Sequence, residues 1–206
     1  MKLVVTAGPT REWIDPVRFL SNPSTGRMGF AVATAAARRG HEVTLVAGPV
    51  ALPTPKGIRR INVTTAREML AATEAAVLGA DAFVATAAVA DWRPAKTAAS
   101  KLKKREMSGV LRLVRNPDIL KTVSCRVKVG FAAETDDVLE EAARKCREKR
   151  LAFIVANDVT EKGSGFGTTT NRVTFVYPDG ARRALPLLSK RRVATEIVRA
   201  VEGILK

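Results

Sequence analysis

Residues 2–40, KLVVTAGPTREWIDPVRFLSNPSTGRMGFAVATAAARRG, decide the fold. The stretch opens with an apolar β run at residues 3–6 and closes with a helical pattern over residues 27–39. A long loop rich in Gly, Pro, Thr, Ser and Arg joins the two. Strand, polar loop and helix are the opening of an α/β unit that binds nucleotides.

Small residues mark the expected start of this helix, namely Ser24, Thr25, Gly26 and Gly29. Free backbone N–H groups and the positive end of the helix dipole attract phosphate there, and small side chains let a ligand approach the backbone. An ordinary capped helix after a long loop is the alternative. The sequence contains neither G-x-G-x-x-G after the first strand nor G-x-x-x-x-G-K-[ST] anywhere, so the phosphate loop must be of another kind.

The rest of the chain alternates strands and helices. Strands are predicted at 42–46, 58–63, 81–86, 110–114, 127–131 and 151–156, and a Gly/Thr-rich loop at 161–171 precedes a hairpin of 172–177 with 181–185. Helices are predicted at 66–78 after the cap Thr65, from the cap Asn116 to about 123, at 136–150, and from the cap Ser189 to 204. The pattern predicts one α/β domain over residues 1–206, with a Rossmann-like mostly parallel sheet, helices on both faces and a C-terminal β-hairpin.

Composition excludes several classes of protein. Of the 206 residues 46% are hydrophobic, which is enough for a sizeable core. No apolar run has membrane-spanning length and the start does not resemble a signal peptide, so we expect a cytoplasmic protein. Cys125 and Cys146 form no C-x-x-C pair, and the only histidine, His41, follows a predicted helix at a turn, so His-based triads are disfavoured. The absence of glutamine and the many Arg, Lys and Glu residues hint at a thermophile.

The net charge of +15 calls for an anionic partner. Phosphate-rich small ligands and nucleic acids are both candidates, but aromatic residues are only 5% of the chain and form no visible stacking platform. The lysine-rich run 96–104 is either a solvated face or a flap that closes on phosphates.

The strand at 81–86 leads into Ala87, Ala88 and Asp91. Ligands of open α/β sheets bind at the carboxyl ends of strands, and two tiny residues followed by an acid suit backbone contact with a ligand and one polar anchor. A plain loop is the alternative.

Six motifs, in this order, resemble phosphopantothenate–cysteine ligase, the phosphopantothenoylcysteine synthetase of coenzyme A synthesis. They are TAGPTREWIDPVRFLSNPSTGRMG at 6–29, AAVADWRP at 87–94, KLKK at 101–104, RNPDIL at 115–120, VGFAAET at 129–135 and VANDV at 155–159. In many prokaryotes this synthetase is fused behind a flavin-dependent decarboxylase domain, which has no counterpart in this sequence.

The resemblance implies a reaction in two steps. The carboxylate of 4′-phosphopantothenate attacks the α-phosphate of a nucleotide, giving an acyl-nucleotide and pyrophosphate, and L-cysteine then displaces the nucleoside monophosphate. Prokaryotic members use CTP and animal members ATP, both with Mg²⁺. Such chemistry needs positioning and charge neutralisation more than a nucleophilic side chain.

The resemblance also implies roles for individual residues. Asn22 would orient the substrate carboxylate and the acyl-nucleotide, with Ala87, Ala88 and Asp91 beside it, and Lys101 would meet the phosphates from a flap. The implied nucleotide set is Gly8, Ser24, Gly26, Gly29, Asn116, Pro117, Asp118, Ile119, Phe131, Lys145 and Lys149. Family members are dimers, and Arg18 would cross to the partner's substrate. The metal ligands are left unassigned, and Arg27 stands where lysine is usual.

Two other functions fit parts of the sequence. A non-catalytic nucleotide- or flavin-binding module would share the phosphate loop, but would not need Asn22 and Lys101. A nucleic-acid-binding protein would share the positive charge, and it would bind DNA in a salt-sensitive way even in the presence of CTP.

Overall fold

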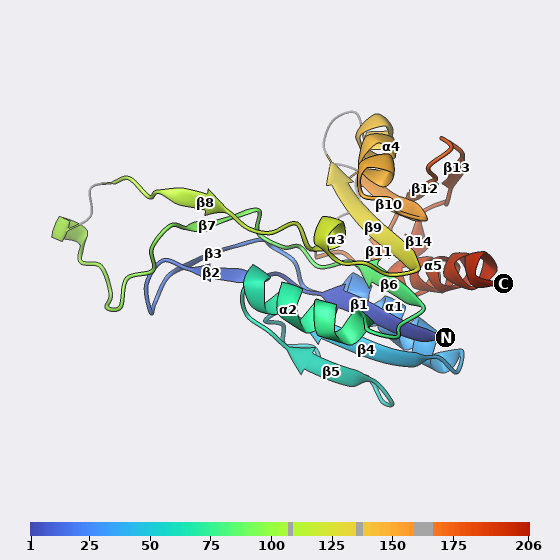
Figure 1. Ribbon diagram of the computed structural model, residues 1–206, viewed down its shortest axis with the longest axis horizontal. Coiled ribbons are helices and arrows are strands. Elements are labelled where there is room, and N and C mark those ends of the chain that lie inside the picture. Colours follow the sequence, from blue (N-terminus) through green and yellow to red (C-terminus); the bar gives the residue numbers. More distant parts are fainter. Residues whose placement is uncertain (107–108, 135–137, 159–166) are drawn as a thin grey trace.

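A computed structural model describes residues 1–106, 109–134, 138–158 and 167–206. The predicted opening is confirmed, with strand β1 at Lys2–Ala7 and helix α1 at Arg27–Arg38. The chain contains an extended sheet with helices on both of its faces, and a narrow arm that projects away from it (Figure 1).

The main sheet has eight strands in the order β13-β12-β10-β9-β6-β1-β4-β5. The six from β10 to β5 are parallel: β10 (Phe153–Asp158), β9 (Val127–Glu134), β6 (Ala82–Ala85), β1, β4 (Glu42–Ala47) and β5 (Arg59–Asn62). The hairpin of β12 (Thr174–Val176) and β13 (Arg182–Ala184) adds antiparallel to β10, as predicted. In chain order the parallel strands run 3-2-1-4-5-6, the doubly wound Rossmann order, so the predicted fold class is confirmed.

The side chains of alternate residues in the buried strands point to opposite faces of the sheet. Leu3 and Val5 of β1 pack with α1 and with α5 (Lys190–Leu205), whereas Val4 packs with α2 (Ala66–Val77) and α3 (Ile119–Thr122). Helix α4 (Val138–Glu148) packs on Ile154 and Ala156 of β10. The predicted caps Thr65 and Ser189 are confirmed, because each side chain accepts a hydrogen bond from the third residue after it.

The long loop predicted between β1 and α1 is wrong in part, because this segment contains a β-hairpin. Strands β2 (Arg11–Trp13) and β3 (Phe19–Ser21) pair antiparallel, and β2 lies against β7 (Trp92–Pro94), which pairs with β8 (Leu113–Arg115). These two hairpins and the 3-10 turn η1 (Lys104–Glu106) form the arm in Figure 1. A further small pair, β11 (Thr170–Asn171) with β14 (Leu188–Ser189), lies beside α5.

Two predicted boundaries are corrected. The strand predicted at 110–114 is β8, shifted to Leu113–Arg115. Asn116 was predicted to cap the short helix, but the cap is Asp118, whose side chain accepts from the backbone N–H of Lys121 at 3.1 Å. The first residues of the helix predicted at 136–150, and most of the loop predicted at 161–171, lie outside the described residues.

An ion-pair cluster joins the end of α1 to α5. Glu202 accepts hydrogen bonds from Nε and Nη2 of Arg39 at 2.7 and 2.6 Å, and from Nε2 of His41 at 2.6 Å. The hydrogen bond from Arg39, helped by His41, lowers the pKa of Glu202 to about 2. Because this pKa lies below the ordinary value of 4.5, the stabilisation is complete above about pH 4.5 and is lost as the pH falls toward 2.

Glu202→Gln is therefore expected to lower the melting temperature at pH 7 and to change it little near pH 2. The partly exposed pair is worth about 1 kcal/mol, which corresponds to about 2–4 °C for a chain of this size. Thermal unfolding at several pH values measures the difference. Glu141→Gln is the control, because its pair with Arg144 is about half exposed on the surface of α4. A difference for Glu202→Gln that persists at pH 2 would contradict the assignment.

Candidate active site

A cleft of about 820 Å³ lies at the carboxyl ends of the parallel strands, around β6 and its neighbour β1. The chain leaves these two strands in opposite directions across the sheet, and such switch points are where doubly wound folds bind ligands. Fourteen residues that the sequence predicted as site residues line it, namely Asn22, Ser24, Gly26, Gly29, Ala87, Ala88, Asp91, Asn116, Pro117, Asp118, Ile119, Phe131, Lys145 and Lys149. They come from segments up to 127 positions apart (149 − 22).

The base of the cleft is made by the segments that follow β1 and β6. The hydroxyl of Thr86 donates to the carbonyl oxygen of Thr6 at 2.6 Å, and the N–H of Ala88 donates to the carbonyl oxygen of Gly8 at 2.9 Å. The two segments therefore continue side by side beyond the sheet. Their small side chains at Ala87 and Ala88 keep the backbone accessible to a ligand.

The N-terminus of α1 faces the same cleft. Its cap residue, Gly26, has a φ of 76°, and no side chain among the described residues caps the helix. The hydroxyl of Ser24 accepts the N–H of Gly26 at 3.3 Å, which shapes the turn into the helix. The first N–H groups of a 12-residue helix are thus directed at the cleft, and this is a suitable environment for phosphate.

Gly29 has a packing role that the sequence did not reveal. A Cβ atom there would lie 2.4 Å from Oγ1 of Thr86 and 2.5 Å from Cβ of Ala7, so α1 approaches the sheet closely only because this residue is glycine. Gly8 is not among the lining residues; it lies beneath Gly26, whose own Cβ would come within 3.4 Å of the Cα of Gly8.

Gly29→Ala is expected to destabilise the fold by about 1–3 kcal/mol, because the added methyl group would push α1 away from β1 and β6. Gly203→Ala is the matched control. It also lies in a helix, but nothing lies within 4 Å of its added Cβ, so we expect stabilisation by about 0.5–1 kcal/mol. Urea midpoints measure both. Equal midpoints for Gly29→Ala and the unmodified protein would show that the helix can move away without cost.

Asn22 connects the end of β3 to the segment after β6. Its Nδ2 atom donates to the carbonyl oxygens of Ala88 and Val89 at 3.2 and 3.1 Å. Two acceptors on one side fix the orientation of the amide, since its oxygen would be repelled there. Asn22 therefore positions the Ala87–Ala88 backbone in addition to lining the cleft itself.

One end of the cleft holds an ion pair between the cap residue that precedes α3 and the residue that follows α4. Nζ of Lys149 lies 2.8 Å from Oδ2 of Asp118. Burial opposes ionisation of Asp118, but the hydrogen bond from Lys149 prevails, and the pKa of the carboxyl lies below its usual value. Asn116, predicted as a cap, instead donates to the carbonyl oxygen of Ala90 at 2.8 Å and so fixes the segment that carries Asp91.

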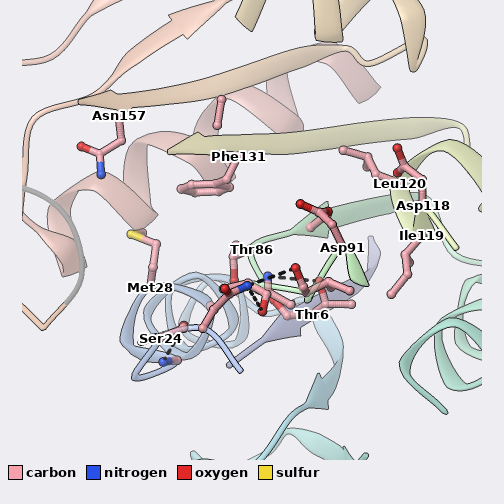
Figure 2. Close-up of a pocket in the computed structure, with 18 of the residues that line it drawn as sticks. Thr6, Ser24, Met28, Thr86, Asp91, Asp118, Ile119, Leu120, Phe131 and Asn157 are labelled. Carbon is pink, nitrogen blue, oxygen red and sulfur yellow. Dashed lines mark hydrogen bonds between the residues drawn. The ribbon is translucent and has the colours of Figure 1, made fainter. Parts of the chain in front are cut away.

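Figure 2 shows Asp118, Ile119 and Leu120 together at this end, Met28 and Asn157 at the other, and Phe131 between them. Sequence reasoning missed the lining residues Asn157, Asn171 and Lys190. Asn157 is the last residue but one of the parallel strand β10, so the rule that ligands bind at the carboxyl ends of strands could have found it. Lys190 carried no such signal; it is 8% exposed, and burial together with the charge of Arg27 lowers its pKa.

Two predicted residues lie in the arm and do not line the cleft of their own chain. Arg18 is in the turn after β2, where Nε donates to Oδ2 of Asp15 at 2.9 Å. Lys101 is exposed and lies between β7 and η1. Within one chain, therefore, the structure does not bring Arg18 or Lys101 to the other site residues.

Metal ligands are sparse. Among residues 1–106, 109–134, 138–158 and 167–206 no group of three or more His, Cys, Asp or Glu side chains could hold an ion. The described carboxylates that line the cleft are Asp91 and Asp118, and Asp118 is paired with Lys149. Mg²⁺ commonly binds proteins through only one or two carboxylates and completes its coordination with water and substrate phosphates.

The family model of the DNA/pantothenate metabolism flavoprotein C-terminal domain matches residues 1–204. The chain belongs to this family. A relative from Vibrio vulnificus (strain YJ016), the coenzyme A biosynthesis bifunctional protein CoaBC, is 47% identical over 210 residues. The match covers 98% of this chain and 52% of the relative, so the chain spans about half the length of that protein.

Solved structures agree with this family. The C-terminal domain of CoaBC has a TM-score of 0.84 and 41% identity, and the match covers 99% of this chain and 95% of that one. A Cab2 variant solved in complex with phosphopantothenate-cysteine has a TM-score of 0.77 and covers 99% and 86%; at 15% identity it shows the likeness of fold alone. None of the helices in the described parts of this family member is both long and apolar enough to cross a membrane.

Proposed function

We propose that this chain is a phosphopantothenate–cysteine ligase that joins 4′-phosphopantothenate and L-cysteine through an acyl-cytidylate, consuming CTP in the cytoplasm. The observation that carries the proposal is the cleft at the switch point, which is lined by Asn22, by the N-terminus of α1 and by the Asp118–Lys149 pair. Membership of a family whose relatives include a coenzyme A biosynthesis protein supports it. That relative is named a bifunctional protein and the match covers 52% of it, so a decarboxylase domain is the proposed partner or fusion.

The geometry suggests how the substrates are arranged. The nucleoside would lie between Phe131 and the end lined by Ile119 and Lys149, and the triphosphate would extend toward the N-terminus of α1. The phosphopantothenate carboxylate would then lie beside Asn22 and Ala88, within reach of the α-phosphate. Attack by the carboxylate forms a C–O–P bond and releases pyrophosphate, and attack by the cysteine amine releases CMP.

No step requires a nucleophilic side chain, which agrees with a described cleft lining that contains neither His nor Cys. Backbone N–H groups and lysines oppose negative charge that grows as pyrophosphate leaves, and preorganised donors of this kind supply much of the rate. Mg²⁺ would enter with the triphosphate, and Asp91 is the residue that would hold it. The positive charge of Mg²⁺ would also oppose the negative charge that grows as pyrophosphate leaves.

The test is release of pyrophosphate by the purified chain with CTP, ATP, GTP or UTP, with and without phosphopantothenate and cysteine. We expect continuous release only with phosphopantothenate, cysteine and CTP together, and at most one equivalent per site without cysteine. A chain that binds CTP but releases nothing would be the non-catalytic binding module.

The active form is proposed to be a homodimer in which Arg18 reaches the partner's substrate. Support comes from the position of Arg18 in the projecting arm, away from the cleft of its own chain. Arg18→Ala mixed with Asn22→Asp should recover activity, because a heterodimer has one site with both residues intact. Random exchange would restore about a quarter of normal activity. Confirmed subunit exchange without recovery would mean that the site is not shared.

A further inference from the structure

Asp15 is a buried carboxylate in the arm to which the proposed reaction assigns no part. Its exposed fraction is 0%, and it lies in the turn between β2 and β3. Its Oδ1 atom accepts the backbone N–H groups of Val17 and Arg18, both at 2.9 Å. This half of the carboxylate forms a local turn of the kind that Asp commonly makes.

The other oxygen links that turn to the segment that carries Lys101. Oδ2 of Asp15 accepts from Nε of Arg18 at 2.9 Å and from the backbone N–H of Leu102 at 3.2 Å. Arg18 completes the link, because its NH2 group donates to the carbonyl oxygen of Leu102 at 2.9 Å. Both backbone polar groups of Leu102 are therefore held by one ion pair, one residue after Lys101.

Further interactions stabilise this connection between Asp15 and the segment that carries Lys101. The hydrogen bond from Arg18 holds the pKa of the Asp15 carboxyl well below its usual range, so the ion pair persists at physiological pH. The N–H of Ala98 donates to the carbonyl oxygen of Ile14 at 2.9 Å, and the hydroxyl of Thr97 donates to that of Trp13 at 2.9 Å. The segment is thus attached to the β2–β3 hairpin both before and after Lys101.

We propose that Asp15 is a positioning residue, which holds Arg18 and Lys101 in place for the reaction by fixing the Leu102 backbone to the turn between β2 and β3. The inference rests on the proposed function, because that function gives Arg18 and Lys101 their roles. Misplacement of a reacting or stabilising group by about 1 Å can cost about a hundredfold in rate. A carboxylate that touches no substrate can therefore control turnover.

The substitution Asp15→Asn can keep the hydrogen bonds of Oδ1 while it removes those of Oδ2. The amide oxygen can still accept from Val17 and Arg18, whereas the amide nitrogen in place of Oδ2 would face the donors of Arg18 and Leu102. Asp179→Asn is the matched control, because Oδ1 of Asp179 makes a similar local bond with the N–H of Ala181 at 2.9 Å in the β12–β13 turn.

Hydrogen exchange tests the link without any need for activity. In Asp15→Asn the amides of residues 97–104 should exchange at least about tenfold faster than in the unmodified protein, because the protecting bond to Leu102 is lost. Asp179→Asn should leave them unchanged. Unchanged exchange in Asp15→Asn would overturn the proposal. Should that variant fail to fold, Arg18→Lys removes the guanidinium bond to Leu102 and is measured in the same way.

A double-mutant cycle tests the consequence for catalysis. Asp15→Asn should lower kcat about a hundredfold with a smaller change in KM, and it should lower kcat much less when Lys101 is already alanine. Independent, multiplicative losses would overturn the positioning role. An unmodified protein without ligase activity would refute the proposed function instead, while the exchange result would still show whether Asp15 fixes the segment.

Discussion

Replacing Asn22 with aspartate is expected to lower turnover about a hundredfold or more, because it removes a well-placed donor and adds an anion beside the substrate carboxylate. The structure adds a second reason. Nδ2 of Asn22 donates to the carbonyl oxygens of Ala88 and Val89, and a carboxylate oxygen in its place would be repelled by both. The segment after β6 would then shift, although the two side chains have nearly the same shape.

A loss of catalysis can be distinguished from a loss of folding by experiment. Asn22→Asp should keep a normal melting temperature, because the affected segment lies at the rim of the cleft, while kcat falls steeply. Asn62→Asp, at the exposed end of β5, is the control; Oδ1 of Asn62 accepts from Nε of Arg60, and a carboxylate preserves that bond. Near-normal turnover of Asn22→Asp would remove Asn22 from the mechanism.

Lys101→Ala is expected to reduce turnover strongly, with a smaller change in apparent CTP affinity. The proposed role is neutralisation of charge that grows as pyrophosphate departs, an interaction stronger in the transition state than in the ground state. Lys101 is exposed and belongs to no apolar contact cluster of the described chain, so the melting temperature should hardly change. Lys103→Ala, two residues away in the same basic run, is the matched control and should retain most of its turnover.

Ordering of the same segment by substrate is the other half of this prediction. Five cationic side chains belong to the run from Lys96 to Arg105 inclusive, and triphosphate with Mg²⁺ would offset their repulsion and draw the segment down. Hydrogen exchange on residues 96–106, measured with and without CTP and Mg²⁺, should show slower exchange when both are present. A Lys101→Ala variant that turns over normally but binds CTP weakly would make Lys101 a binding residue only.

The hydrophobic pattern and the helix caps were sufficient to predict the main sheet. β1 and β6 are apolar because they are buried on both faces, and Thr65 and Ser189 accept hydrogen bonds as local chemistry demands. Local signals were too weak for the arm. Its strands β2, β3, β7 and β8 have three residues each, and they pair through contacts between distant segments rather than through an alternating pattern.

In the candidate site, too, sequence signals predicted some residues, whereas contacts between distant segments could not be predicted. Resemblance indicated Asn22, Asp118 and Lys149, and the structure places all three around one cleft. The charge pattern indicated a solvated face or a flap around Lys101, but it could not reveal that Asp15, more than 80 positions earlier, is bonded to Leu102. Spacing likewise placed the short helix two residues early, because Asn116 and Asp118 are both plausible caps and only the fold assigns Asn116 to the carbonyl of Ala90.

The central claim is that the cleft activates a carboxylate as an acyl-nucleotide, and isotope transfer tests it most directly. Phosphopantothenate carrying ¹⁸O in its carboxylate is incubated with the enzyme, CTP, Mg²⁺ and cysteine, and the products are weighed by mass spectrometry. If the carboxylate attacks the α-phosphate, the bridging oxygen leaves with the nucleotide, and each CMP carries one ¹⁸O. Unlabelled CMP, or label in orthophosphate released together with CDP, would contradict the account.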